Sequence, residues 1–347
     1  MAERLYFNDK NNLELTDRIF ELINNARESI KTGNFFFKDR RINDALLEAA
    51  SRGVAIFVLS NLTGSENRGY VRTNTKVETD PHIPNLHELH RHGAHVHLCD
   101  DLHAKFLICD SKEGLIMSAN YTPDSLYGNP ENGVDVCGEE LKDLELIFDT
   151  LYVHPDTILS EDGKSYRYLK KRLPVSLKAF ENIGKKSRLL LTASSTGNSN
   201  LKDCSYRLIY AKLIQLTDSA KEALILVSWS YNQVKLLPEF KKALNNAIKR
   251  GVKVTLFYGT KGADKQKERT HTQLVELLGS ENVKRMTAPF ADNHAKCIIT
   301  ESEGALFTAN IDGNKGLLTG FELGCILTEE QRLQSIRKIN QILENGK

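Results

Sequence analysis

Two short patterns of polar residues in this chain contain the groups that can hold and attack a phosphate. The first pattern has His103 and Lys105, and the second has His294 and Lys296. Seven residues after each histidine lies an acid, and a hydroxyl residue, an alanine and an asparagine follow it. These acids, hydroxyls and amides are Asp110 and Glu301, Ser118 and Thr308, and Asn120 and Asn310. A single His-x-Lys tripeptide has no significance, but two with the same continuation predict one site built from two halves.

The two imidazoles could divide the work of breaking a phosphodiester. One histidine can attack phosphorus, and the other can protonate the leaving oxygen and then activate water. Histidine suits both tasks because its unperturbed pKa lies near neutrality. The two lysines can neutralise the non-bridging oxygens, and the amides and hydroxyls can donate further hydrogen bonds. Because the protein supplies these cations itself, we expect neither a metal ion nor another cofactor.

The elements that must position these groups also occur twice. Residues 45–54 and 243–252 each predict an amphipathic helix that ends at an Arg-Gly pair, and an apolar strand follows each. A second helix is expected near 85–92 and 272–278. The remaining expected strands are 94–99 and 282–286, 104–109 and 295–300, 115–118 and 305–308, and 134–137 and 323–327.

This alternation of helices and strands predicts an α/β fold with two similar α/β sandwich halves. Each half is expected to hold a mixed sheet, and a pseudo-twofold axis would bring the repeated polar groups together. We assign residues 1–155 to the first half, 156–188 to a basic connecting segment and 189–347 to the second half. Within each motif strand, the histidine and the lysine two residues later should point to the same side. The acids lie at odd offsets, so we interpret them as supporting groups that steady the lysine or nearby loops.

The two patterns resemble the signature of the phospholipase D superfamily, His-x-Lys-x4-Asp-x6-Gly-Ser-x-Asn. The first copy has Met117 in place of the glycine. The second has Glu301 for aspartate, Phe307 for glycine and Thr308 for serine, and is one residue shorter. The first copy resembles most the bacterial nuclease branch of that superfamily.

The resemblance implies a pseudo-twofold fold and a phosphohistidine on one of the two histidines. We expect His103 to be the nucleophile, because its motif is nearer the consensus, and His294 to act as acid and base. The resemblance also implies that a glutamate after each motif supports a histidine, and Glu131 and Glu322 occupy those positions. All the reacting groups are present, which favours an intact active site over a non-catalytic homologue.

The substrate we expect is DNA or RNA, because basic and aromatic residues surround the motifs and could contact a phosphate backbone and bases. The basic candidates are Arg68, Arg72, Lys76, Lys170, Lys171, Arg172, Lys261 and Lys265. The aromatic candidates are Trp229 and Tyr231, together with Tyr70 and Phe35–Phe37, for which core packing is the competing interpretation. Two alternatives remain open: a phospholipase D or phosphatidyl transferase acting on lipids, and a nucleic-acid-binding effector subunit of a bacterial defence complex.

Composition limits the setting and the partners. The apolar content of 40% is ordinary for a globular protein, and no apolar run has the length of a membrane helix. Six scattered cysteines without a Cys-x-x-Cys pair fit a reducing, cytoplasmic location. We expect nucleic acid as a partner and no stable membrane insertion, and the sequence leaves homo-oligomers and protein partners of a defence or repair complex open. Six histidines between His82 and His97 are interpreted as surface or phosphate-contact groups and not as a zinc site.

Overall fold

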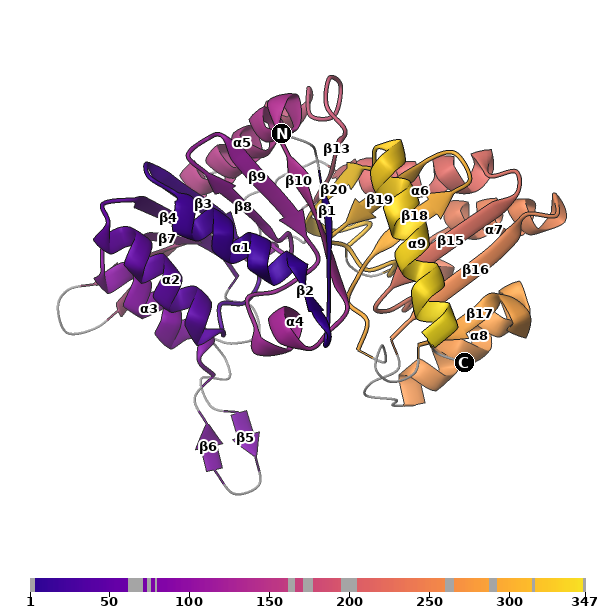
Figure 1. Ribbon diagram of the computed structural model, residues 1–347, viewed down its shortest axis with the longest axis horizontal. Coiled ribbons are helices and arrows are strands. Elements are labelled where there is room, and N and C mark those ends of the chain that lie inside the picture. The colour runs from indigo at the N-terminus through magenta and orange to yellow at the C-terminus, as the bar shows by residue number, and fades with distance from the viewer. Residues whose placement is uncertain are drawn as a thin grey trace.

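Two α/β halves lie side by side in the computed structural model of the protein (Figure 1). The structure describes residues 4–61, 71–73, 76–78, 80–161, 166–170, 177–194, 205–259, 265–286, 292–313 and 316–345. Within these ranges, each half contains one large mixed sheet, of ten strands in the first half and eight in the second. The predicted fold class is therefore confirmed.

The strands divide between the halves in chain order. The first sheet contains β1 (Leu5–Asp9), β2 (Asn12–Leu13), β3 (Ser29–Gly33), β4 (Ala55–Ser60), β7 (His95–Leu98), β8 (Phe106–Cys109), β9 (Glu113–Met117), β10 (Glu131–Val136), β11 (Thr157–Glu161) and β12 (Tyr166–Lys170). The second contains β13 (Leu189–Ser194), β14 (Ser205–Arg207), β15 (Ala223–Ser228), β16 (Lys253–Tyr258), β17 (Val283–Arg285), β18 (Cys297–Thr300), β19 (Gly304–Phe307) and β20 (Gly320–Ile326).

The same order of strands appears in both sheets. The first runs β2-β1-β10-β9-β8-β3-β4-β7-β11-β12, and the second runs β14-β13-β20-β19-β18-β15-β16-β17. The strands β3, β4 and β7 are parallel to one another, as are β15, β16 and β17, whereas each motif strand is antiparallel to its neighbours. Eight strands of the first sheet therefore have a counterpart in the second, which gives the pseudo-twofold relation.

Nine helices are found among the described residues and cover the sheets. They are α1 (Glu14–Asn25), α2 (Arg40–Ser51), α3 (His82–Arg91), α4 (Pro123–Tyr127), α5 (Gly138–Val153), α6 (Leu208–Ser219), α7 (Pro238–Lys249), α8 (Lys265–Leu278) and α9 (Glu329–Asn345). The predicted Arg-Gly helix ends are confirmed, since α2 and α7 stop just before Gly53 and Gly251, at φ +89° and +83°. Glycine adopts this left-handed conformation without the steric penalty of a Cβ atom.

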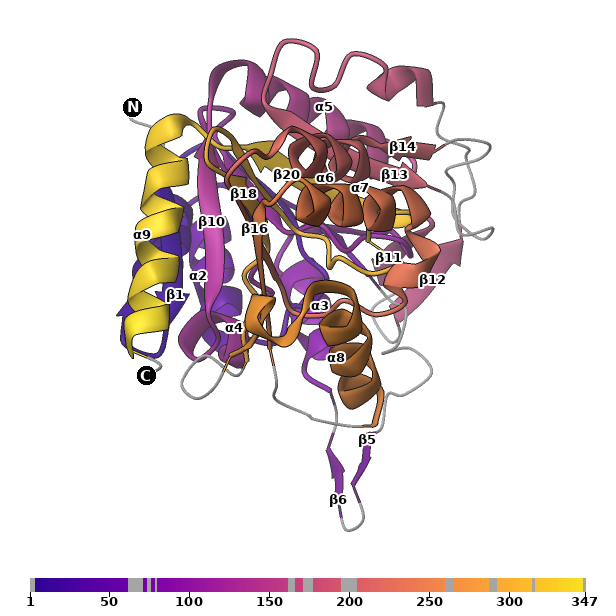
Figure 2. The same ribbon diagram turned by 90° about the vertical axis from the view of Figure 1, so that its right-hand side faces the viewer.

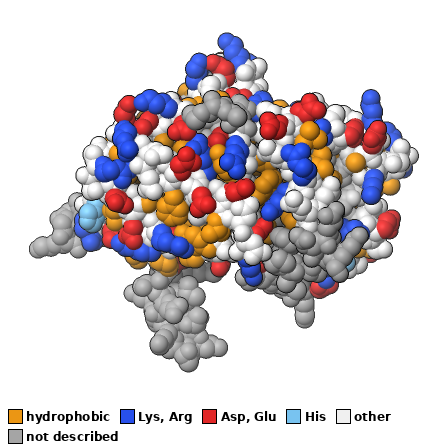
Figure 3. Space-filling model, in the orientation of Figure 1, with side chains coloured by type: hydrophobic (Ala, Val, Ile, Leu, Met, Phe, Trp, Pro, Cys, Tyr) orange, Lys and Arg blue, Asp and Glu red, His pale blue; other side chains and the backbone are white. Residues whose placement is uncertain are grey.

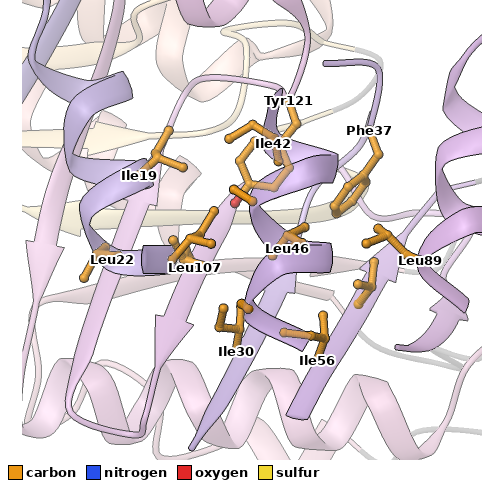
Figure 4. Packing of buried hydrophobic residues seen from close by; sticks show 14 of the residues in the cluster. Ile19, Leu22, Ile30, Phe37, Ile42, Leu46, Ile56, Leu89, Leu107 and Tyr121 are labelled. Carbon is orange, nitrogen blue, oxygen red and sulfur yellow. The ribbon is translucent and has the colours of Figure 1, made fainter. Parts of the chain in front are cut away.

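Apolar side chains on one stripe of α2 pack directly on the first sheet. Ile42 and Leu46 are buried against the strand residues Ile30 and Ile56 (Figure 4). The Asp39 carboxylate fixes the start of this helix by accepting a hydrogen bond of 3.0 Å from the N–H of Ile42. A separate apolar cluster covers the corresponding face of the second sheet with residues from α6, α7 and α8.

A third apolar cluster joins the two halves. It combines Phe106 and Val134 of the first sheet, Phe148 of α5, and Leu191 and Phe321 of the second sheet. All of these side chains are nearly inaccessible to solvent. Burial of this apolar surface fixes how the halves dock, and therefore how the two motifs face each other. On the opposite flank, α9 lies beside β10 and β1 (Figure 2).

Part of the expected basic connecting segment extends the first sheet. β11 pairs with β7 and with β12, so these residues form a hairpin at the sheet edge. Arg188 also belongs to the fold, because its guanidinium forms an ion pair of 2.9 Å with Glu140. The described residues 157–161 and 166–170 and Arg188 of this segment therefore belong to the folded structure.

The two motif acids hold loops in place. The Asp110 carboxylate accepts hydrogen bonds from the backbone N–H groups of residues 27, 28 and 29, at 2.8–3.1 Å. Glu301 accepts the matching bonds from residues 221, 222 and 223, at 3.0–3.4 Å. Each acid thus fixes the turn that leads from the first helix of its half into the first parallel strand.

We predict that Asp110→Ala lowers the free energy of unfolding by about 2 kcal/mol, because charge-assisted hydrogen bonds to backbone N–H groups are lost. These N–H groups lower the pKa of Asp110, although burial alone would raise it. The stabilisation should therefore be present at neutral pH and disappear as the pH falls through this lowered pKa. Urea unfolding at pH 7 and at pH 3 measures it, with Asp17→Ala, an exposed substitution on α1, as the control. Equal stabilities of the two variants at pH 7 would contradict the prediction.

Candidate active site

Each motif histidine is anchored by the backbone of the opposite half. The N–H groups of His103 and Ala104 donate to the carbonyl of Phe321, at 3.0 and 2.9 Å. The N–H groups of His294 and Ala295 donate in the same way to Pro130, at 2.8 and 2.9 Å. Two successive N–H groups on one carbonyl bend the chain, so the regular strands begin only at Phe106 and Cys297. The expected strand starts at 104 and 295 are wrong for this reason.

Each half also supplies the glutamate that supports the histidine of the other half. Glu322, in the second half, accepts a hydrogen bond of 2.7 Å from Nδ1 of His103. Glu131, in the first half, lies 3.6 Å from Nδ1 of His294. The second carboxylate oxygens of Glu131 and Glu322 accept hydrogen bonds from Ser118 and Thr308. The hydroxyl of each motif therefore orients a glutamate that acts across the interface.

The two glutamate–histidine contacts between the halves differ, and the sequence contains a reason for the difference. Phe321 also donates its own N–H to the carbonyl of Asp101, at 2.8 Å, and forms a bridge with Leu102. At the matching position of the first half stands Pro130, which has no N–H to donate. The segment before Glu322 is thus tied more closely to the opposite half than the segment before Glu131. This difference accompanies the shorter carboxylate–imidazole distance at His103.

The two motif lysines lie at the bottom of the site. Lys105 and Lys296 are 1% and 3% exposed, whereas the His103 and His294 side chains are 33% and 27% exposed. Each ammonium donates to the carbonyl of its own motif histidine, at 2.6 Å for Lys296. A phosphate must therefore pass the imidazoles before it can reach the ammonium groups.

Burial weakens the positive charge of these lysines. It lowers the pKa of Lys105 to about 7, while the charges of Glu322 and Glu131 act in the opposite direction and Lys296 lowers it further. Burial also lowers the pKa of Lys296. A bound phosphate dianion or diester would favour the charged ammonium forms, because it brings an opposite charge into a poorly solvated site. The interactions among these four residues show that both motifs converge on one place.

His103 is arranged to have a free electron pair at neutral pH. Burial lowers its pKa and the positive charge of Lys105 adds to this effect, although the Glu322 carboxylate opposes it. Glu322 keeps a lowered pKa, because His103, Lys105 and Thr308 outweigh the effect of its burial. A neutral His103 that donates from Nδ1 to this carboxylate leaves Nε2 unprotonated and pointing away from Glu322.

The two motif asparagines occupy matching positions. Asn120 and Asn310 each lie three residues beyond the end of a strand, β9 or β19. Among the described residues, neither side-chain carbonyl oxygen finds a hydrogen-bond partner, although both are buried. Both amides thus have unused hydrogen-bonding capacity, and rotation of the carboxamide would turn its N–H groups to the same position.

Two aromatic rings stand beside the histidines, and both belong to the aromatic candidates predicted from the sequence. The ring centroid of Trp229 lies 5.6 Å from that of His294, and the ring of Phe35 lies 5.2 Å from His103. Phe37 packs against Tyr121 in the core, as the competing interpretation expected. The expectation for Tyr231 is wrong: it is 2% exposed, packs in the second core and donates its hydroxyl to the Phe257 carbonyl at 3.3 Å.

The basic candidates fall largely outside what the structure describes. Arg68, Lys171, Arg172 and Lys261, and with them the aromatic Tyr70, lie outside the described residues. Arg72 and Lys76 belong to the hairpin of β5 (Val71–Thr73) and β6 (Lys76–Glu78), Lys170 ends β12 and Lys265 begins α8, and the side chains of these four are not described. The β5–β6 hairpin projects from the first half in both views (Figures 1 and 2).

One histidine of the 82–97 group is not a surface residue. His82 is fully buried, accepts the N–H of Phe37 at Nδ1 and lies 2.9 Å from the Asn61 carbonyl through Nε2. The surface interpretation is wrong for His82, because this side chain ties together the loops that follow β3 and β4.

No group of three or more potential metal ligands occurs among the described residues. The five described cysteines form no disulfide.

Comparison with known proteins agrees with this geometry. Residues 19–152 match the family model described as cardiolipin synthase, PLD-like domain. No curated protein matches the chain. The phosphatidylserine synthase of Haemophilus influenzae Rd KW20 shares the fold with a TM-score of 0.68 and 12% identity, over 99% of this chain and 86% of that one. The polyphosphate kinase of Porphyromonas gingivalis gives 0.57 and 12%, over 99% of this chain and 50% of that one.

A smaller solved structure matches one half of the chain. Nuc from Salmonella typhimurium, a phospholipase D family member, is 16% identical with a TM-score of 0.38, over 49% of this chain and 99% of that one. The family match over residues 19–152 supports a relation to the phospholipase D superfamily, and the larger structures share the fold of the whole chain.

We predict that sulfate binds about 15-fold more weakly at pH 8.5 than at pH 7, because Lys105 loses its proton above its pKa of about 7. Sulfate keeps its charge over this range, so isothermal titration calorimetry of the full chain isolates the change in the protein. In Lys105→Arg the loss should be smaller, because guanidinium does not titrate here. The exposed Lys112→Arg substitution is the matched control. An affinity that stays constant between these pH values would contradict the pKa.

Proposed function

We propose that this protein is a phosphodiesterase that cleaves nucleic acid through a phosphohistidine intermediate. The observation that supports the proposal is the exchange of glutamates, which brings one His, one Lys and one Glu of each half close to one another. A site with this pseudo-twofold arrangement offers one imidazole to each side of a bound phosphate. The proposal extends the superfamily assignment to a substrate class and to roles for individual residues.

In the first step, Nε2 of His103 attacks phosphorus and forms a P–N bond. The P–O bond to the leaving alcohol breaks, and His294 delivers a proton to that oxygen. The Lys105 and Lys296 ammonium groups neutralise the non-bridging oxygens as their charge grows, together with the Asn120 and Asn310 amides. The assignment of His103 as nucleophile is supported by its direct hydrogen bond to Glu322, which fixes the tautomer with Nε2 unprotonated.

In the second step, water takes the place of the departed alcohol. His294, neutral after the first step, accepts a proton from this water as its oxygen attacks phosphorus. The P–N bond breaks and His103 is restored with its electron pair. The product is a phosphomonoester, and both histidines end in the protonation states in which they started. Neither step requires a metal ion, since lysines supply the positive charge.

The surface of the protein supports a polar substrate over a membrane. Four large hydrophobic residues are exposed among the described residues: Leu146 and Val153 on α5, Leu236 in the 3-10 turn 234–236, and Leu333 on α9. On the face shown in Figure 3, Lys and Arg residues are interspersed with Asp and Glu. No helix in the described ranges has the length and apolarity to cross a bilayer.

Lipid phosphodiesters are the second candidate substrate class. The matched family model and the phosphatidylserine synthase both carry the names of lipid enzymes, and the same two-step chemistry would transfer a phosphatidyl group. Identity of 12% supports a shared fold and leaves the substrate open. A nucleic-acid-binding effector subunit without turnover is the third candidate. A substrate panel separates all three.

We predict that the purified protein cleaves single-stranded or double-stranded DNA or RNA in the presence of EDTA, and that cleavage falls steeply with salt. The double variant His103→Ala, His294→Ala should lose activity by at least about 10³-fold, because both reacting groups are absent. The exposed His92→Ala substitution is the matched control. Release of alcohol from phospholipid vesicles without nuclease activity would establish the lipid alternative, and tight binding without turnover would establish the effector subunit.

We predict that bis(4-nitrophenyl) phosphate leaves a phosphoryl adduct on His103, because 4-nitrophenolate departs without needing a proton. His294→Asn should accumulate this adduct, since no base activates the water, whereas His103→Asn should form none. Peptide mass spectrometry after a rapid quench in alkali locates the acid-labile P–N bond. An adduct on His294 in the wild-type protein or in His103→Asn would reverse the assigned roles.

A further inference from the structure

The rings of Phe35 and Trp229 occupy equivalent positions in the two halves. Phe35 lies two residues after β3, and Trp229 directly follows β15, the matching strand of the second sheet. Phe35 meets His103 edge to face at an interplanar angle of 64°, and Trp229 is tilted against His294 by 55°. Both rings are half-buried. One aromatic ring therefore flanks each histidine, from the loop that follows the first parallel strand of each sheet.

The loop that carries Phe35 is fastened to the residues immediately after Asn120. Asn34 accepts the N–H groups of Phe36 and Tyr121 at 3.3 and 3.2 Å, and its amide donates to the Ala119 carbonyl. The N–H groups of residues 38 and 39 both donate to the Tyr121 carbonyl, at 2.7 and 2.9 Å. Phe35 is consequently held in place relative to the catalytic amide.

The loop that carries Trp229 is likewise fastened to the residues after Asn310, with a carboxylate as an additional acceptor. The Asp312 carboxylate accepts the Ser230 hydroxyl at 2.7 Å and the Asn232 N–H at 2.5 Å. Gly313 donates its N–H to the Asn232 carbonyl, and a Cβ atom at this glycine would lie 2.1 Å from the carbonyl of Gln233. One bond is shared by the two halves, since Ser228 accepts the N–H of Ile311 at 3.1 Å as Asn34 accepts that of Tyr121, and Asp312 is an addition of the second half.

We infer that Phe35 and Trp229 are stacking platforms for the two nucleobases that flank the scissile phosphate, so that the substrate is an unpaired strand. The inference rests on the proposed nuclease function and adds to it the class of nucleic acid. The lysines are almost fully buried behind the imidazoles, so a phosphate that reaches them brings its neighbouring nucleosides beside both rings. In a duplex the faces of the bases are covered by their neighbours, whereas an unpaired base offers its face to a ring.

The two platforms serve different sides of the phosphate. In-line attack by His103 places the leaving oxygen opposite that histidine, next to His294, which protonates it. Trp229 therefore takes the base of the leaving nucleotide, and the indole offers it a larger surface than the Phe35 ring offers on the retained side. Lys105 lies 5.8 Å from the centre of the Phe35 ring, so a positive charge accompanies the retained side.

Trp229 is the single tryptophan of the chain, so its fluorescence reports stacking at this position alone. The test uses the full-length His103→Asn protein, which keeps the Trp229–His294 contact. It is titrated with a single-stranded deoxynucleotide octamer, with the same octamer in a duplex, with an abasic octamer, and with vesicles of zwitterionic phospholipid. We expect saturable quenching by the single strand and at least about tenfold weaker binding of the duplex and of the abasic strand, since stacking contributes about 1–3 kcal/mol per base.

Substitutions separate stacking from folding. In the same background, Phe35→Ala should weaken binding of the single strand about tenfold, and Phe35→Tyr should restore it. Phe57→Leu removes a ring that is stacked on His95 away from the site, and should leave binding unchanged. Cleavage of nucleic acid by the wild-type protein without any quenching by the octamer would overturn the stacking inference alone. Binding and quenching by vesicles, with no binding of any nucleic acid, would overturn the proposed function as well.

Discussion

The carboxylate–imidazole contact between the halves is the interaction on which the site depends. Glu322 belongs to the second sheet and holds His103 of the first, while Glu131 crosses in the other direction toward His294. Neither half can complete its own histidine, so the site exists only when the two sheets are docked. The apolar cluster around Phe106 and Phe321 supplies the docking free energy, and the paired backbone bonds to residues 130 and 321 set the register. Docking and assembly of the site are therefore one event.

Docking also buries charged residues of the candidate site. Two lysines and two glutamates are removed from water in the same small volume, and burial lowers the pKa of Lys105 to about 7. The motif hydroxyls donate to both carboxylates and His103 donates to Glu322, whereas Oε1 of Glu131 is buried without a hydrogen-bond partner among the described residues. Each ammonium group donates to the backbone carbonyl of its own motif histidine. A phosphate that enters this volume would bring negative charge to ammonium groups that have lost their hydration. The positive charge is then already in place for the negative charge that grows on phosphate during the proposed transfer.

The symmetry between the two halves breaks at the residue that precedes each interface glutamate. Phe321, which precedes Glu322, donates an extra backbone hydrogen bond to the opposite half, and Glu322 accepts a direct hydrogen bond from His103. Pro130, which precedes Glu131, has no N–H to donate, and Glu131 lies 3.6 Å from His294. The aromatic rings beside the histidines differ as well. These differences distinguish the two histidines from each other, as the proposed roles of one nucleophile and one acid–base group require.

The sequence by itself determined which residues form the candidate site and that they come in two sets, because the repeated spacing of His, Lys and Asn can be read directly along the chain. It also determined the order of helices and strands, since periodicity and the Arg-Gly helix ends are local properties, although the bend at His103 moved the start of the motif strand. Only the tertiary structure decided which glutamate serves which histidine, since that pairing spans more than 200 residues for His103 and Glu322. It also turned Tyr231 inward and placed Phe35 beside His103, because the side of the chain that a loop residue presents depends on the segments packed against it.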